Sequence, residues 1–292
     1  MSIEFLYIQL ILTTIFTGVA CCLPGTFLIL RGTSLISDAI SHAIFLGIVI
    51  SFLIFKQLYT PILFAGATVT ALITIWIIEK IIANKRLESD AAIGIIFPFL
   101  FSIATLLINL YAQNIHLDID AVLMGELVFT PFFQILWNEK MIGSYALWTM
   151  IIIFFINLFT ITVMYKKLLT TTFDPYFAHT VGYNTNKVHW MLMTLTSITI
   201  LGTFEATGAI LVIAFIIIPP ATAYLLCKSV KEILIISSLL SILGILIGCL
   251  IANIFETSIA ASITVIFSLL FTIAYFKNLY LNDQLYNRNL MQ

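Results

Sequence analysis

Charged side chains are scarce in this sequence of 292 residues. Only 9% of the residues are charged, 61% are hydrophobic, and the mean hydropathy is +1.13. A water-soluble domain carries about 25% charged residues, so this composition cannot cover a surface that faces water. With 13 Lys and Arg residues and a formal net charge of -1, a basic face for nucleic acid is also excluded. The composition therefore predicts a chain that is solvated mainly by a lipid bilayer.

The sequence has only four cysteines and no nucleotide-binding motif. Cys21 and Cys22 are adjacent, while Cys227 and Cys249 stand alone, so the sequence has neither a C-x-x-C metal motif nor a disulfide framework. We interpret these residues as small apolar side chains. The sequence also lacks the G-x-x-x-x-G-K-[ST] phosphate loop. We therefore expect a chain that is not an enzyme, and any ATP hydrolysis that it uses must come from another polypeptide.

Long apolar runs make up most of the chain. A membrane-spanning helix needs about 20 residues, and charged residues separate nine runs of suitable length: 5–30, 32–55, 57–78, 91–111, 141–165, 188–204, 206–227, 233–255 and 257–276. A shorter apolar piece around Leu127 to Trp137 predicts a re-entrant or interfacial helix, which makes the count eight or nine. The sequence therefore predicts an all-α polytopic membrane protein, with one transmembrane domain over residues 1–276 and a cytoplasmic tail over 277–292.

The distribution of Lys and Arg predicts the orientation. If nine spans begin with the N-terminus outside, eleven cations face the cytoplasm and two, Lys56 and Lys140, face outward. This bias agrees with the positive-inside rule. The same arrangement places an excess of carboxylates outside, which would raise the local concentration of cations. We therefore expect a multi-pass protein of the cell membrane with its C-terminus in the cytoplasm.

Asp38 and His42 lie well inside an apolar run. An Asp at the centre of a membrane helix costs about 2.5 to 3.5 kcal/mol to insert, so it should face protein or water. The i, i+4 spacing puts both side chains on one helix face, where a carboxylate and an imidazole suit Zn(II) or Mn(II). The alternative is a structural pair that locks helix packing. A metal site would need further ligands from another span or another copy of the chain.

A second group of possible ligands is predicted at the outer mouth. His116, Asp118 and Asp120 form an H-x-D-x-D sequence, and Glu126 and Glu205 are also expected on that side. The group is either a solvated rim or a surface that receives the delivered ion. Glu205 either favours cations or caps the start of a span.

Residues 166–187 are predicted to form the longest loop on the inner side. Asp174 followed by Pro175 is typical of a helix start, and Gly182 is typical of a helix end. We therefore expect a short helix on the membrane surface, with His179 as a surface residue. An ordinary surface turn is the alternative.

Four segments, in the same order along the chain, resemble the signature of the ABC-3 family of zinc and manganese ABC-transporter permeases. They are Arg31 to Gly47 (R-G-T-S-L-I-S-D-A-I-S-H-A-I-F-L-G), Glu88 to Phe97 (E-S-D-A-A-I-G-I-I-F), Phe173 to Gly182 (F-D-P-Y-F-A-H-T-V-G) and Gly208 to Ala223 (G-A-I-L-V-I-A-F-I-I-I-P-P-A-T-A). Glu205 departs from the family pattern, which often has an amide or Lys there.

The resemblance implies a type II ABC importer permease-like fold and a homodimer in the lipid bilayer. It implies two kinds of partner, an ATP-binding cassette subunit in the cytoplasm and an extracytoplasmic metal-binding protein. Zn(II), Mn(II) or Fe(II) would be the cargo, with no permanently bound cofactor. The segment marked by Phe173, Asp174, Pro175 and Gly182 would be the helix that couples the permease to the ATPase.

Two other functions are compatible with the residues. A vitamin B12 or siderophore permease of related architecture would need a wide pore and has little use for an intramembrane Asp and His. An ATP-independent metal/proton antiporter would use Asp38 and His42 as a proton relay.

Overall fold

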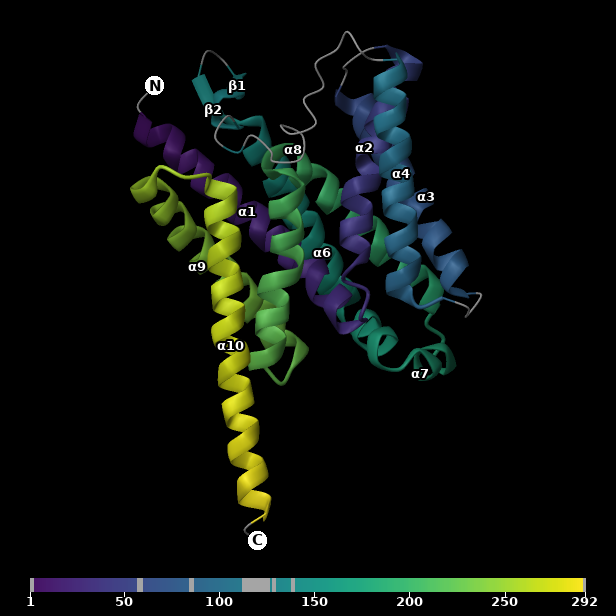
Figure 1. Cartoon of the computed structure of the whole chain (residues 1–292), viewed down its shortest axis with the longest axis vertical. Helices are drawn as coiled ribbons and strands as arrows, with labels where there is room; N and C mark the ends of the chain where they lie inside the picture. Colours follow the sequence, from purple (N-terminus) through teal and green to yellow (C-terminus); the bar gives the residue numbers. More distant parts are fainter. Residues whose placement is uncertain are drawn as a thin grey trace.

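The computed structural model describes residues 3–56, 60–83, 87–111, 127, 130–137 and 140–290. Helices dominate these residues (Figure 1). The elements are α1 (Ile3–Leu30), α2 (Ile36–Phe55), α3 (Thr60–Ala83), α4 (Ser89–Tyr111), η1 (Thr130–Phe132), β1 (Gln134–Trp137), β2 (Lys140–Ser144), α6 (Tyr145–Phe173), α7 (Pro175–Thr180), α8 (Thr185–Leu226), α9 (Val230–Phe255) and α10 (Ile259–Leu290). The all-α class predicted from composition is confirmed.

Within the described residues, eight helices are long and apolar enough to cross a membrane. They correspond to eight of the nine predicted runs. The run at 188–204 is not one of them because its Thr and Ser residues lower its hydropathy. Several of these side chains, including Thr196, Thr199 and Thr203, are buried within the bundle. This segment is thus covered by protein more than by lipid.

Helix α8 consists of two arms that fold back on each other. It spans 42 residues and leaves helical φ/ψ at Gly208 (φ 76°, ψ 169°), a conformation open to glycine because it has no Cβ. A straight helix of this length would extend about 63 Å. Val188 at its start and Val230 just beyond its end nevertheless belong to one buried cluster with Phe27. The break at Gly208 therefore returns the chain to its starting level.

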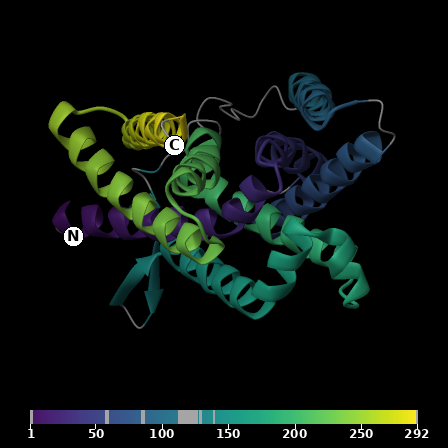
Figure 2. The same cartoon turned by 90° about the horizontal axis from the view of Figure 1, so that it is seen from below.

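The segment between α4 and α6 corrects one prediction. Leu127 to Trp137 was expected to form a re-entrant or interfacial helix, but Gln134–Trp137 is a strand paired antiparallel with Lys140–Ser144. A short apolar run does not by itself distinguish a helix from a strand. In Figure 2 this hairpin projects from one side of the bundle at the start of α6. Ser144 ends the hairpin and caps α6 by accepting a hydrogen bond from Leu147 N at 3.2 Å.

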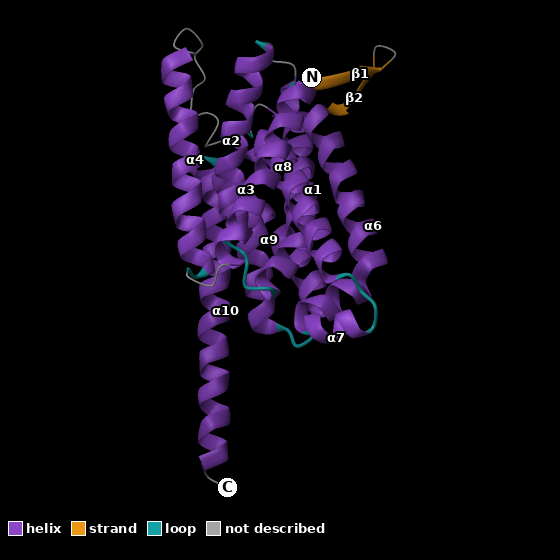
Figure 3. Ribbon diagram, turned by 90° about the vertical axis from the view of Figure 1, so that its right-hand side faces the viewer, coloured by secondary structure: helices purple, strands orange, loops and turns teal. Residues whose placement is uncertain are grey.

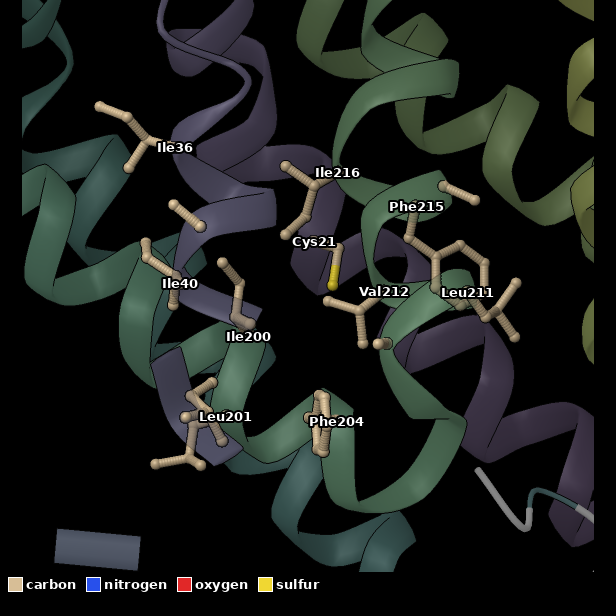
Figure 4. Packing of buried hydrophobic residues seen from close by; sticks show 14 of the residues in the cluster. Cys21, Ile36, Ile40, Ile200, Leu201, Phe204, Leu211, Val212, Phe215 and Ile216 are labelled. Carbon is tan, nitrogen blue, oxygen red and sulfur yellow. The ribbon is translucent and has the colours of Figure 1, made fainter. Parts of the chain in front are cut away.

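Small residues bring α1 against α8 in the core. A Cβ on Gly25 would lie 2.2 Å from the carbonyl oxygen of Ile216, so these two backbones touch. Around this crossing, Cys21 of α1, Ile40 of α2, and Val212 and Phe215 of α8 form one buried cluster (Figure 4). Cys21, Cys22 and Cys249 are buried and free, and Cys227 is half-buried and free, in agreement with their interpretation as apolar side chains.

The two ends of the bundle differ. The N-terminus and the β-hairpin lie at one end, whereas α7 and the C-terminus lie at the other (Figure 3). The last helix, α10, continues well beyond the rest of the bundle at the α7 end (Figure 1). An odd number of membrane crossings places the two chain termini at opposite ends. The number is odd here when each arm of α8 is counted as one crossing.

Candidate metal site and contacts at the α7 end

The chain turns sharply before the Asp38 and His42 helix. Gly32 has φ 66°, and the N–H groups of Gly32 and Thr33 bond to Ile29 O and Leu28 O, both at 3.0 Å. This is the Schellman pattern, which ends α1. The predicted run at 32–55 becomes helical only at Ile36, so Asp38 lies in the first turn of α2.

Asp38 and His42 contact each other on one face of α2, as their spacing predicts. Oδ1 of Asp38 lies 3.3 Å from Nε2 of His42. The His42 ring stacks on Phe97 of α4, with 5.0 Å between ring centres, and meets Phe101 edge-on at 5.6 Å. The imidazole orientation is therefore set by aromatic packing from α4, and its Nε2 faces the carboxylate.

Both side chains remain accessible. Asp38 is 29% and His42 is 23% exposed, so the pair is not sealed inside the bundle. An accessible carboxylate and imidazole can accept a borderline divalent cation. Among the described residues, no group of three or more His, Cys, Asp or Glu side chains is placed to hold a metal. In the described part of one chain, Asp38 and His42 are therefore the two ligands available at this place. A complete metal site needs further ligands.

The predicted outer-mouth residues cannot be compared with the structure. His116, Asp118, Asp120 and Glu126 lie outside the described residues. Glu205 lies in the first arm of α8, three positions before the break at Gly208, and its side chain is likewise outside what the structure describes. Their roles remain predictions.

The predicted short helix is present. In α7, Asp174 is the N-cap, and its Oδ1 accepts a hydrogen bond from Phe177 N at 2.8 Å, while Pro175 occupies the first position. Gly182 has φ 86° and follows the helix end. One correction concerns residues 166–187, which are not a loop throughout, because α6 continues to Phe173. A long lysine side chain near the end of a membrane helix can reach the polar surface of the membrane while its backbone stays in the helix. Lys166 and Lys167 can therefore be part of α6.

The surface around α7 is apolar and exposed. Phe173 is 62%, Tyr176 is 89% and Phe177 is 56% exposed. Of the α7 residues, only Ala178 is buried. His179 is also exposed, in agreement with its prediction as a surface residue.

A polar cluster near α7 was not predicted from the sequence. Arg31, which follows α1, donates from Nε to Thr172 Oγ1 at 3.2 Å and from Nη2 to Thr171 Oγ1 at 3.1 Å. Its Nη1 lies 3.3 Å from Nδ1 of His189 in α8, and Nε2 of His189 contacts Oε1 of Glu79 in α3. Burial lowers the pKa of Arg31. The sequence shows only that the ionisable members of this cluster lie near the ends of apolar runs, and it does not show that they meet.

Comparisons with known proteins agree with this architecture. The model of the ABC 3 transport family matches residues 2–278. The chain is 37% identical over 253 residues to the manganese transport system membrane protein MntD of Bacillus subtilis (strain 168), covering 87% of this chain and 85% of that protein. It is 34% identical over 267 residues to the zinc transport system membrane protein TroD of Treponema pallidum (strain Nichols), covering 91% of this chain and 72% of that protein.

A solved structure has the same overall fold. It is PsaBC from Streptococcus pneumoniae in complex with Fab, which superimposes with a TM-score of 0.76 at 29% sequence identity. The match covers 94% of each chain.

Proposed function

This chain belongs to the ABC 3 transport family, and from that premise we propose that it is the membrane permease subunit of an ATP-driven importer of manganese or zinc. The observation that carries the proposal is the accessible Asp38 and His42 pair on a membrane helix. Relatives of this chain are named as manganese and zinc transport proteins, and both metals accept carboxylate and imidazole ligands.

The pair is suited to passing an ion onward. A closed zinc site has four protein ligands, often thiolates, and holds the ion tightly. Asp38 and His42 offer a carboxylate and an imidazole but no thiolate, and their exposed surface would permit release, since conduction requires binding of moderate strength. In a homodimer, the second copy would supply another Asp38 and His42, and the cation would pass between the copies by alternating access.

The partners follow from what the chain offers and what it lacks. The sequence has no nucleotide phosphate-binding loop, so a separate ATP-binding cassette subunit would provide the energy. The exposed aromatic residues of α7 and the preceding Phe173 suit a groove on that subunit. An extracytoplasmic metal-binding protein would deliver the ion to the opposite face, at the cell membrane, with transported Zn(II) or Mn(II) as cargo.

The first experiment is metal uptake by the complete transporter, formed by this chain with its ATPase and the metal-binding protein, in proteoliposomes. Wild type should take up Mn²⁺ or Zn²⁺ only with ATP. Asp38→Asn keeps the side-chain size but removes the charge, and uptake should fall about tenfold or more, equivalent to about 1.4 kcal/mol or more of lost stabilisation. Asp90→Asn is the matched control, because Asp90 is an exposed carboxylate in the first turn of α4.

The other candidate functions give different results in the same assay. Uptake without ATP or an ATPase would support an antiporter. Uptake of a metal chelate but not of the free ion would support a chelate permease. Normal metal uptake by Asp38→Asn would remove Asp38 from the path.

A further inference from the structure

Arg31 uses three nitrogen atoms of its guanidinium to join three helices. It stands directly after α1, its Nε and Nη2 donate to the hydroxyls of Thr172 and Thr171 at the end of α6, and its Nη1 contacts His189 of α8. Thr171 is buried, and Arg31 and Thr172 are half-buried. A lysine could not make this set of contacts, because its single ammonium lacks the planar fork of a guanidinium.

His189 extends the connection to a fourth helix. A guanidinium has only donors, so in its contact with Arg31 the Nδ1 atom of His189 must accept. The other ring nitrogen, Nε2, then carries the hydrogen that is donated to Glu79 of α3. An imidazole thus separates Arg31 from Glu79. We call this connected set the Arg31 bridge; it consists of Arg31, Thr171, Thr172, His189 and Glu79.

The bridge is attached to the candidate metal site through a short bonded turn. After Arg31, the N–H groups of Ile36, Ser37 and Asp38 bond to the carbonyls of Thr33, Ser34 and Leu35, each at 3.1 Å. A turn with its backbone hydrogen bonds made moves as a unit rather than as a loose linker. A shift of Arg31 is therefore passed to the start of α2, where Asp38 lies.

The other end of the bridge is attached to α7. Thr172 is two positions before Asp174, the N-cap of α7. Because only Ala178 of α7 is buried, a force applied to α7 reaches the bundle mainly through its two covalent continuations. One leads back into α6, and the other leads through residues 181–184 into α8, which carries His189. Thr171 and Thr172 are the α6 side chains that bind Arg31.

We propose that Arg31 is a positioning residue that transmits movement of α7 to the helix carrying Asp38 and His42. The inference rests on the proposed function and adds to it a physical link between the ATPase contact and the metal pair. Coupling between distant sites requires a contiguous connection of this kind. Loss of the connection should let ATP be hydrolysed without moving metal.

The test removes the hydroxyls that Arg31 binds and leaves Arg31, Asp38 and His42 in place. The double variant Thr171→Val and Thr172→Val is examined in the complete transporter in proteoliposomes, with Mn²⁺ uptake and ATP hydrolysis measured on the same preparation. We expect ATP hydrolysis to continue and Mn²⁺ uptake per ATP to fall about fivefold, within the range measured for such networks. Equilibrium binding of Mn²⁺ should remain as in wild type.

Two matched variants separate coupling from folding. Thr170→Val removes a neighbouring hydroxyl, on a half-buried residue, that bonds only to Lys166 O, and it should leave the ratio unchanged. Thr171→Ser with Thr172→Ser keeps both hydroxyls and should retain the wild-type ratio.

An unchanged ratio in the double Val variant would overturn the inference. Equal loss of ATP hydrolysis and uptake, or a complex that no longer assembles, would also overturn it, since the contacts would then only support the fold. A wild-type complex that takes up neither Mn²⁺ nor Zn²⁺ with ATP is a distinct result, which would overturn the proposed function and the inference with it.

Discussion

Asn157 and the pair of Asp38 and His42 are polar residues of membrane helices that differ in how their partners are arranged. Asn157 of α6 is 1% exposed, and its amide donates to Ala20 O at 2.9 Å and to Thr199 Oγ1 at 2.8 Å. It joins α6 to α1 and α8 and has its partners within the protein. Asp38 and His42 have each other and remain partly exposed. The first arrangement is typical of helix packing, and the second leaves room for a ligand.

Replacing Asn157 should destabilise the bundle. Asn157→Leu removes both donor bonds between helices, and such bonds in membrane proteins contribute about 0.6 kcal/mol on average and up to about 1.7 kcal/mol. We expect a loss of about 1 to 2 kcal/mol, measured as a lower thermal midpoint in detergent. Thr162→Val is the control on the same helix, because Thr162 is exposed and bonds only to the backbone of α6. Equal midpoints for the two variants would show that Asn157 has no packing role.

At the scale of the elements, glycine determines how closely α1 and α8 pack. The space for a Cβ at Gly25 is occupied by the backbone of Ile216, and a backbone cannot move aside as a flexible side chain does. At Gly94 of α4, a Cβ would meet nothing within 4 Å. The two glycines therefore form a matched pair for one substitution.

Gly25→Ala should lower stability by about 1 to 3 kcal/mol or more, the usual cost of overpacking. Gly94→Ala should be neutral or raise stability by up to about 1 kcal/mol, because alanine is the better helix former. Thermal unfolding of both purified variants provides the comparison. A stable Gly25→Ala protein would mean that the α1 and α8 crossing can open.

The α7 helix depends on its N-cap. Asp174→Ala removes the bond from Phe177 N and should cost about 1 kcal/mol of local helix stability, which would loosen the surface offered to the ATPase. Co-purification with the ATPase should fall, whereas Asp174→Ser, which can still cap, should preserve it. An unchanged yield with Asp174→Ala would argue against α7 as the coupling helix.

At the scale of the whole molecule, the two termini lie at opposite ends of the bundle (Figure 1). The break at Gly208 produces this arrangement, because it divides α8 into two arms where one straight helix would leave an even number of crossings. The charge bias, with eleven of 13 Lys and Arg on one side in the nine-span arrangement, predicts that the C-terminus is cytoplasmic.

Tags at the two ends should therefore differ in access. In intact spheroplasts, an N-terminal tag should be cleaved by added protease and a C-terminal tag should be protected, while inside-out vesicles should give the reverse. Cleavage of both tags from the same side would mean an even number of crossings, with the first arm of α8 not acting as a span.

Much of the fold was predictable because membrane helices are set by local properties. Apolar length decides which segments cross the bilayer, and the Asp174, Pro175 and Gly182 pattern predicted α7 because caps act within one turn. The contact between Asp38 and His42 was predictable for the same reason, since i, i+4 residues meet on any helix. Their role with a metal stays a prediction.

The sequence by itself determined that this protein lies in a lipid bilayer, that it is helical and that Asp38 pairs with His42. Each of these depends on composition or on residues within a few helical turns of one another. Only the tertiary structure decided that Leu127 to Trp137 contributes a strand and that α8 folds back at Gly208. It also brought Arg31, Glu79, His189 and the end of α6 together. These residues are up to 158 positions apart, and their contact depends on how the helices pack, which no local pattern records.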